Sequence, residues 1–460
     1  MTAPVPSADP TANRRPASDV SVAVGLCGLI ALTGWIMVCH FWPEIVGALG
    51  LSSRAERLTG PYAALTGLVV AAAPMVLWEV LVSKVHRRAS TGIDWDQPRP
   101  LASIVDVSIT KLAGLWATWA LIGFLYCVAR WYWQDPYLIA MHVLGSAAPV
   151  LFVLSIPYVL WLDRVLVEPR DATWHFGALL IGREPFDPAK VWMHLRAWAV
   201  KGFFTAFMIS IVPGGFANLV TPDWSNFFSS PPGIAALLIT LMFVIDEQIG
   251  TVGYILTMKP LDAQIRSANP YLAGWLAALL CYPPFQIMGA GHPLFYTANT
   301  FGDDNWFHLL DGQDMLLRLW AALLIVLTGI YAWATLAFGI RFSNLTYRGV
   351  LTNGPYAFTR HPAYLSKNLF WWCAALPFFV SNGSAVDAVR NTFFLGCVSA
   401  IYFWRAKAEE RHLLAEDPKY GAYSAWMERN GLITGPLFRL GKVVKGKRQV
   451  SAGANSGTVY

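Results

Sequence analysis

Long apolar runs separated by short polar loops make up most of this chain. A helix needs about 20 residues to cross a hydrocarbon core of roughly 30 Å, and these runs are continuous instead of alternating as in a membrane β-barrel. The pattern predicts an all-α fold, a polytopic transmembrane helical bundle of about ten spans. The predicted spans are 20–42, 61–82, 108–130, 136–162, 193–216, 232–257, 270–289, 315–340, 363–380 and 386–404.

Lysine and arginine residues fall mainly into alternate loops, and membrane proteins retain these residues on the cytoplasmic side. With ten spans, the segments assigned to the cytoplasm hold 25 of the 34 Lys and Arg residues, and the segments on the opposite side hold four. The loops 217–231 and 290–314 contain neither residue type. Both chain termini are therefore predicted to be cytoplasmic.

Composition divides the chain into four segments. Residues 1–19, rich in Pro, Ala, Ser and Thr, are predicted to be a disordered cytosolic tail, and this composition points to a bacterial inner membrane. Residues 20–314 form an N-terminal membrane region with a substrate-binding or structural role. Residues 315–437 form a second membrane core, and 438–460 a basic flexible tail that contacts anionic lipid heads.

The overall charge balance excludes several classes of protein. Hydrophobic residues make up 55% of the 460 positions and charged residues 13%, which rules out a collagen, a coiled coil or a wholly disordered chain. The net charge is +6, but the basic residues alternate between loops, so nucleic-acid binding is not expected. The six cysteines lie in apolar runs without the spacing of a zinc site.

A first polar element stands directly before the predicted span 363–380. Gly354 and Pro355 predict a turn, and Pro362 fits the first position of a helix, where no N–H is lost. Arg360 and His361 are then held at a helix N-terminus, whose free N–H groups favour anions. This element consists of Gly354, Tyr356, Arg360, His361, Pro362 and Tyr364.

A second polar element follows the last predicted span and contains Glu409, Glu410, Tyr420 and Tyr423. The predicted topology puts it on the same side as the first element. An anion-binding helix entrance beside two carboxylates fits a ligand that carries both signs of charge. Taken alone, Arg360 and His361 are also typical of basic residues that anchor a helix at the membrane–water interface. The two glutamates alone are also typical of a solvent-exposed helix end, where Glu409 pairs with Arg405.

Together the two elements resemble the C-terminal half of the isoprenylcysteine carboxyl methyltransferases and related membrane phospholipid methyltransferases. The shared pattern is Gly-Pro-Tyr, Arg-His-Pro-x-Tyr, Glu-Glu-Arg-x-Leu and a closing Tyr-x-x-Tyr, over roughly residues 320–437. The resemblance implies a site for S-adenosylmethionine (SAM) that opens to the cytosol, and an acceptor that enters from the bilayer. The small members of the family offer no match for the N-terminal region, which puts the acceptor in question more than the cofactor.

The resemblance implies a SAM-dependent enzyme that methylates a membrane-resident lipid or prenyl-type acceptor at a carboxylate, amine or hydroxyl. Arg360, His361 and Glu410 are the expected catalytic residues. All residues of both elements are expected to bind SAM, with Arg360 on its carboxylate and Glu409 or Glu410 on its ammonium or ribose. A carboxylate acceptor needs no strong base, whereas an amine or hydroxyl needs one, such as His361.

A third polar group lies within the apolar spans. Asp246 and Glu247 stand in the middle of a predicted span, where each ionised side chain costs about 2.5 to 3.5 kcal/mol. We expect them to bind substrate or to pair with a basic residue of another span, namely Lys111, Arg196 or Lys201. Lys367, Asn368 and Trp371 share a helix face with Tyr364, and this face could line an opening for a lipid head.

No metal site is expected, because His292, His308 and the pair Asp303-Asp304 lack the spacing of metal ligands. Two other functions remain open. One is an NADPH-dependent enzyme like the sterol reductases, although their Cys-containing closing motif is missing after residue 410. The other is a transporter or lipid-binding membrane protein that works through Asp246 and Glu247.

Overall fold

The computed structural model describes residues 14–51, 54–182, 185–301 and 305–436. The fold is mostly helical, and its described part contains a single two-stranded antiparallel sheet, in which β1 (Ser267–Ala268) pairs with β2 (Thr346–Tyr347). The predicted basic tail 438–460 and the pair Asp303-Asp304 lie outside the described residues.

Within the described residues, seven helices are long and apolar enough to cross a membrane. Their number and composition agree with a multi-pass membrane protein. The helices are α1 (Val22–His40), α3 (Pro61–Leu77, continued by a π-helical turn to Val82), α4 (Leu101–Ala129), α5 (Leu138–Val165), α7 (Pro188–Val220), α8 (Pro231–Ile255) and α11 (Asp314–Phe338, continued by a 3-10 turn to Arg341).

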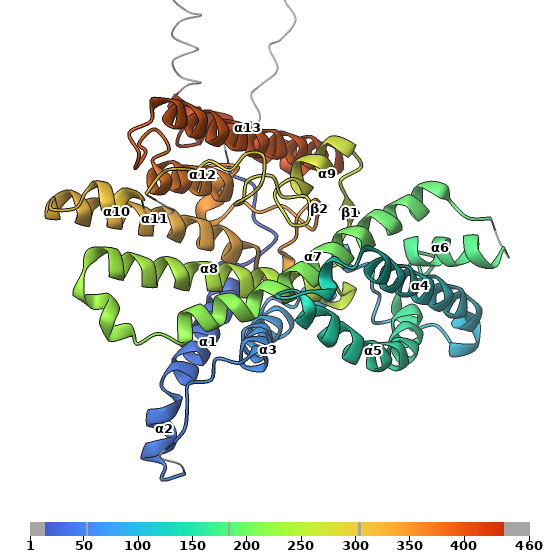
Figure 1. Cartoon of the computed structure of the whole chain (residues 1–460). Helices are drawn as coiled ribbons and strands as arrows, with labels where there is room; N and C mark the ends of the chain where they lie inside the picture. The colour runs from blue at the N-terminus through green and yellow to red at the C-terminus, as the bar shows by residue number, and fades with distance from the viewer. Residues whose placement is uncertain (1–13, 52–53, 183–184, 302–304, 437–460) are drawn as a thin grey trace, which may run out of the picture.

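The remaining α-helices are shorter or more polar. They are α2 (Trp42–Ala48), α6 (Ala172–Ile181), α9 (Leu272–Leu279), α10 (Asn305–Leu309), α12 (Pro362–Ala375), α13 (Ala385–Glu416) and α14 (Pro418–Asn430). In Figure 1, α12 and α13 lie next to each other at one end of the molecule, whereas α4, α5 and α6 form a separate group at the side.

The count of ten spans is not confirmed. The prediction of one helix over 270–289 is wrong, because α9 ends at Leu279 and Pro283-Pro284 have no N–H groups to continue it. Segment 363–380 forms α12, whose 14 residues cover about 21 Å. Segment 386–404 begins the 32-residue helix α13, whose C-terminal half carries Arg405, Glu409 and Glu410.

Close helix contacts depend on small residues at particular points. Helix α4 crosses α6 where Gly114 and Gly177 face each other. A Cβ atom added to Gly177 would lie 1.9 Å from the carbonyl oxygen of Thr110, and one added to Gly114 would lie 2.5 Å from that of Thr173. Such a crossing resembles the close backbone approach of small-residue contacts between membrane helices.

Arg348, directly after β2, joins the two predicted membrane regions. Its side chain is 4% exposed and donates hydrogen bonds to five main-chain carbonyl groups, and no carboxylate within 4 Å pairs with it among the described residues. Three of these carbonyls belong to Gly253, Leu256 and Ala263 of the N-terminal region. The other two belong to Ile340 and Phe342.

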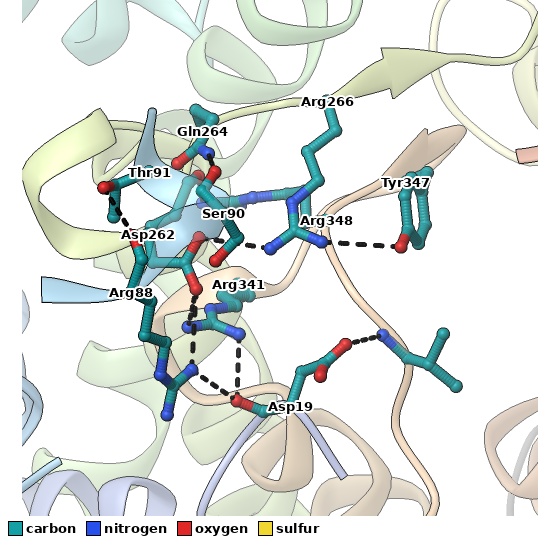
Figure 2. Close-up of polar contacts among 12 residues, drawn as sticks. Asp19, Arg88, Ser90, Thr91, Asp262, Gln264, Arg266, Arg341, Tyr347 and Arg348 are labelled. Atoms are coloured by element: carbon teal, nitrogen blue, oxygen red, sulfur yellow. Dashed lines mark hydrogen bonds and ion pairs between the residues drawn. The ribbon is translucent and has the colours of Figure 1, made fainter. Parts of the chain in front are cut away.

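A second joint gathers three arginines around one buried carboxylate, as Figure 2 shows. Asp262 is 1% exposed and pairs with Arg341 at 3.1 Å, Arg266 at 3.1 Å and Arg88 at 3.5 Å. Arg88 and Arg341 also donate to the main-chain oxygen of Asp19. The segments before α1, after α3, after α8 and after α11 therefore meet at this point.

The end of the predicted disordered tail makes defined contacts. The Asp19 carboxylate accepts hydrogen bonds from the main-chain N–H of Val350 and from Lys419 of α14. Lys419 and its hydrogen bond, together with that from Val350, lower the pKa of Asp19, although burial alone would raise it. Thr352 donates to the carbonyl oxygen of Pro16. Residues 16–19 therefore pack against the C-terminal core, and residues 1–13 lie outside the described part.

Candidate functional site

The first polar element forms a turn that leads into α12. A 3-10 turn spans Gly354–Ala357, and Gly354 has a φ of +56°, a backbone conformation that favours glycine. Pro362 is the first residue of α12, and His361 is its N-terminal flanking residue. The local sequence thus holds Arg360 and His361 at a helix N-terminus, as predicted.

The second polar element is divided between α13 and α14. Asp417 stands between α13 and α14 and accepts a hydrogen bond at 2.8 Å from the main-chain N–H of Lys419, and Pro418 is the first residue of α14. The chain turns between the two helices at this point. The turn brings α14 back beside α13, so that Tyr420, Tyr423 and Glu409 line one cavity. Glu410 lies just outside its wall.

The two elements contact each other directly. Oε1 of Glu410 lies 2.9 Å from Nε2 of His361 and 3.2 Å from Nε of Arg360. Arg360 also donates to the hydroxyl of Ser424 on α14 at 2.7 Å. Tyr364 of α12 donates a hydrogen bond to Glu409. The two polar elements therefore lie side by side in the fold.

Glu410 is a firmly ionised carboxylate. Burial alone would raise its pKa, but hydrogen bonds from His361 and Lys407, and the charges of His361 and Arg360, lower the pKa to about 2. Glu410 does not line the cavity itself. Its contacts instead fix the side chains of Arg360 and His361, which do line it.

Glu409, the neighbouring carboxylate, lines the cavity. It accepts hydrogen bonds from Tyr364 and, at 3.4 Å, from Nε of Arg405. Arg405 is 2% exposed, packs against the rings of three tyrosines, and donates to Asn344 at 2.6 Å. These rings belong to Tyr282, Tyr364 and Tyr402. The geometry thus distinguishes the two glutamates, which the sequence could not do.

The cavity has a volume of about 160 Å³ and lies between α11, α12, α13, α14 and the loop 342–351. Predicted site residues in its wall are Tyr356, Arg360, His361, Tyr364, Lys367, Glu409, Tyr420 and Tyr423. Seven tyrosines line the cavity. Four of them were predicted, namely Tyr356, Tyr364, Tyr420 and Tyr423, and the others are Tyr282, Tyr331 and Tyr402. Tyrosine faces attract cations, so this wall suits a positively charged ligand group.

Several predicted site residues lie outside the cavity wall. Gly354, Pro362, Glu410, Asn368, Trp371, Asp246 and Glu247 do not line it. The side-chain amide of Asn368 donates to the main-chain oxygen of Tyr364, four residues earlier on α12, and Trp371 packs against Tyr402. Nζ of Lys367 lies 5.0 Å from the ring centre of Tyr331 and 5.4 Å from that of Trp371.

Asp246 lies behind the cavity wall and is held there by two wall residues. It accepts hydrogen bonds from Tyr331, at 2.8 Å, and from Thr335. None of the three basic partners expected from the sequence pairs with it among the described residues. Lys111 pairs with Asp163 and Asp171, and Lys201 donates to Thr257. Arg196 forms no ion pair with Asp246 within 4 Å.

Sequence reasoning missed much of the wall. Tyr282, Asn344 and Arg348 come from connecting segments, and nothing in their local sequence marks them. Tyr331 and Thr335 stand four residues apart on α11, as would any two residues on one helix face. The sequence predicts that Arg405 pairs with Glu409, one helical turn away, but only as an ion pair on the surface.

Among the described residues, no group of three or more His, Cys, Asp or Glu side chains could hold a metal ion. No protein-family model matches the chain, and no curated protein and no solved structure matches it either.

Proposed function

We propose that this protein is an integral membrane methyltransferase that transfers the methyl group of SAM to a membrane-resident, amphipathic lipid or prenyl-type acceptor. The observation that carries the proposal is the convergence of the two polar elements at one cavity. Glu410 and His361 touch although 49 residues separate them. The resemblance to the methyltransferase family rests on these same two elements.

The wall offers complementary groups for each part of SAM. Arg360 uses two of its N–H groups on Glu410 and Ser424, and its remaining N–H groups can bind a carboxylate. Glu409 can accept hydrogen bonds from an ammonium or a ribose. The ring of Tyr356 in the cavity wall suits a sulfonium.

The chemistry asks little more than alignment. SAM supplies a methyl group on a sulfonium, which is already a good leaving group. The residues of this chain therefore have to orient the donor, hold the acceptor in line with it and keep water out. Glu410 acts as a positioning residue, because it holds Arg360 and His361 in place. When its ring is neutral, His361 donates Nε2–H to Glu410, and its other nitrogen, Nδ1, is the base if the acceptor must lose a proton.

The proposal includes a location. The charge distribution of the loops supports both termini and the cavity on the cytoplasmic side, in a bacterial inner membrane. The acceptor reaches the cavity from the bilayer. The N-terminal region contributes Tyr282 to the wall and supports Arg348, and so shapes the cavity instead of forming a separate unit.

Transfer of label tests the proposal. Purified protein in lipid nanodiscs is incubated with methyl-tritiated SAM and total bacterial lipid, and the organic phase is counted and analysed for products 14 mass units heavier than the acceptor. We expect label in an organic product, and at least a tenfold lower rate for Tyr364→Phe or Glu409→Gln. An inactive protein over the full set of bacterial lipids would contradict the proposal.

An NADPH-dependent reductase is the competing enzyme. Four arginines line the cavity, and a dinucleotide would need such charge for its phosphates. However, Arg341 and Arg405 are already paired with Asp262 and Glu409, and Arg348 is bound to carbonyl groups, so fewer arginines are available to phosphates than the count of four suggests. Thermal stabilisation by NADPH instead of by SAM or its demethylated product would favour the reductase.

A further inference from the structure

Asp246 is a carboxylate in the middle of α8, a helix of membrane-spanning length. Among the described residues it has no ion pair within 4 Å. An ionised group at membrane depth costs several kcal/mol unless it is bound, and such residues usually face a functional site.

The contacts of Asp246 connect it to the cavity. Both of its carboxylate oxygens accept hydrogen bonds, one from Tyr331 and one from Thr335, and both of these residues line the cavity. The two stand one turn apart on α11. The carboxylate of α8 therefore lies directly behind the part of the wall that α11 forms.

This arrangement fixes what the two hydroxyl groups offer to a ligand. A hydroxyl has one hydrogen and two lone pairs. Because Tyr331 and Thr335 each donate their hydrogen to Asp246, their lone pairs are what these two hydroxyls have left for a ligand. These two hydroxyls accept hydrogen bonds from N–H or O–H groups, whereas a carboxylate, whose oxygens are acceptors only, finds no donor in them. Lys367, over the ring of Tyr331, supplies the balancing positive charge at this end.

We propose that this end of the cavity binds the polar head of the acceptor, and that the head donates hydrogen bonds, as an amine or a hydroxyl does. Asp246 is then a specificity-determining positioning residue that acts through Tyr331 and Thr335. The inference rests on the proposed function only in calling the bound lipid the methyl acceptor, because binding of the polar head does not itself require methyl transfer. It assigns a role in recognition to the N-terminal region, which supplies α8.

Three amphiphiles of equal chain length test the inference: dodecylamine, dodecanol and dodecanoic acid. Binding to the full-length protein in nanodiscs is followed by fluorescence-monitored thermal unfolding at increasing amphiphile concentration. Wild-type protein should bind dodecylamine or dodecanol at least tenfold more tightly than dodecanoate. Whichever of the two binds better identifies the head as amine or hydroxyl. Equal binding of all three, or tighter binding of dodecanoate, would overturn the inference.

Two variants examine the mechanism of the preference. Asp246→Asn should lower it at least tenfold, because the new amide can donate to Thr335 and turn a hydroxyl hydrogen toward the cavity. Tyr331→Phe should do the same and keeps the ring beneath Lys367, so it serves if Asp246→Asn does not fold. Unchanged preference in a folded variant of either kind would contradict the role of Asp246.

Glu247→Gln is the matched control. Glu247 neighbours Asp246 on α8, but its carboxylate faces Gly215 of α7, and it does not line the cavity. The head-group preference should stay at the wild-type value. Calorimetric titration with S-adenosylhomocysteine in the same preparations separates the two proposals. Absent binding of that compound, with an Asp246-dependent preference, overturns the methyltransferase proposal and supports the head-group site.

Discussion

The carboxylate of Glu410 on α13 lies 2.9 Å from Nε2 of His361, at the beginning of α12. The same oxygen lies 3.2 Å from Nε of Arg360. These contacts hold Arg360 and His361, which line the cavity, through the charge of Glu410. Its protonation should therefore be visible in the stability of the whole protein.

Acid should destabilise the protein through Glu410. Its pKa falls from an ordinary 4.5 to about 2, so the unfolded state binds the proton more tightly. The resulting stabilisation is complete above about pH 4.5 and is lost as the pH falls toward 2. Over this pH range the free energy of unfolding of the wild-type protein should fall by about 3 kcal/mol more than that of Glu410→Gln, as measured by denaturant unfolding. Glu428→Gln, at an exposed position of α14, should keep the wild-type profile.

Replacing Arg348 should destabilise the protein strongly. Arg348→Met leaves five carbonyl groups without their donor, and we expect a loss of about 3 to 5 kcal/mol in thermal or denaturant unfolding. Arg348→Lys should recover only part of this, because one ammonium cannot reach all five carbonyls. Wild-type stability of Arg348→Met would show that the joint between the two regions does not depend on this side chain.

The contact of α4 with α6 should tolerate no side chain at Gly177. A Cβ atom there would lie 1.9 Å from the carbonyl oxygen of Thr110, so Gly177→Ala should cost at least about 2 kcal/mol. Gly123, on α4 but away from the contact with α6, has open space where a Cβ atom would lie. Gly123→Ala should be neutral or stabilise the helix by up to about 1 kcal/mol. Equal melting temperatures for the two variants would refute the crossing.

Reporter fusions test the orientation of the chain. We expect a C-terminal green fluorescent protein to fluoresce, because it folds in the cytoplasm. Alkaline phosphatase fused after Ser225, in the loop without Lys or Arg between α7 and α8, should be active, because it folds on the opposite side. The reverse pattern would contradict the topology that the loop charges predict.

The sequence predicted the helical membrane fold well where hydropathy alone decides the outcome. Seven of the predicted spans correspond to helices of spanning length. It failed at 270–289, where a hydropathy average hides the effect of Pro283 and Pro284 on a helix. The turn chemistry around Gly354 and Pro362 was correctly predicted, because glycine and proline restrict the backbone locally.

The wall of the cavity was only half predictable. Motif residues such as Arg360 and Glu409 could be found, because two short patterns coincide. Arg348 could not, because its partners are main-chain carbonyls, which carry no sequence signal. Asp246 was recognised by its cost in a membrane, but its expected basic partners were wrong, and the hydroxyl groups of Tyr331 and Thr335 take their place.

Calorimetric titration of S-adenosylhomocysteine into the purified protein in nanodiscs tests the central claim most directly. The account predicts saturable binding at one site per chain, at least tenfold weaker in Glu409→Gln and in the double variant Arg360→Ala, Glu410→Ala. Absence of binding to the wild-type protein, or wild-type affinity in the folded double variant, would contradict the claim that the two polar elements enclose this ligand.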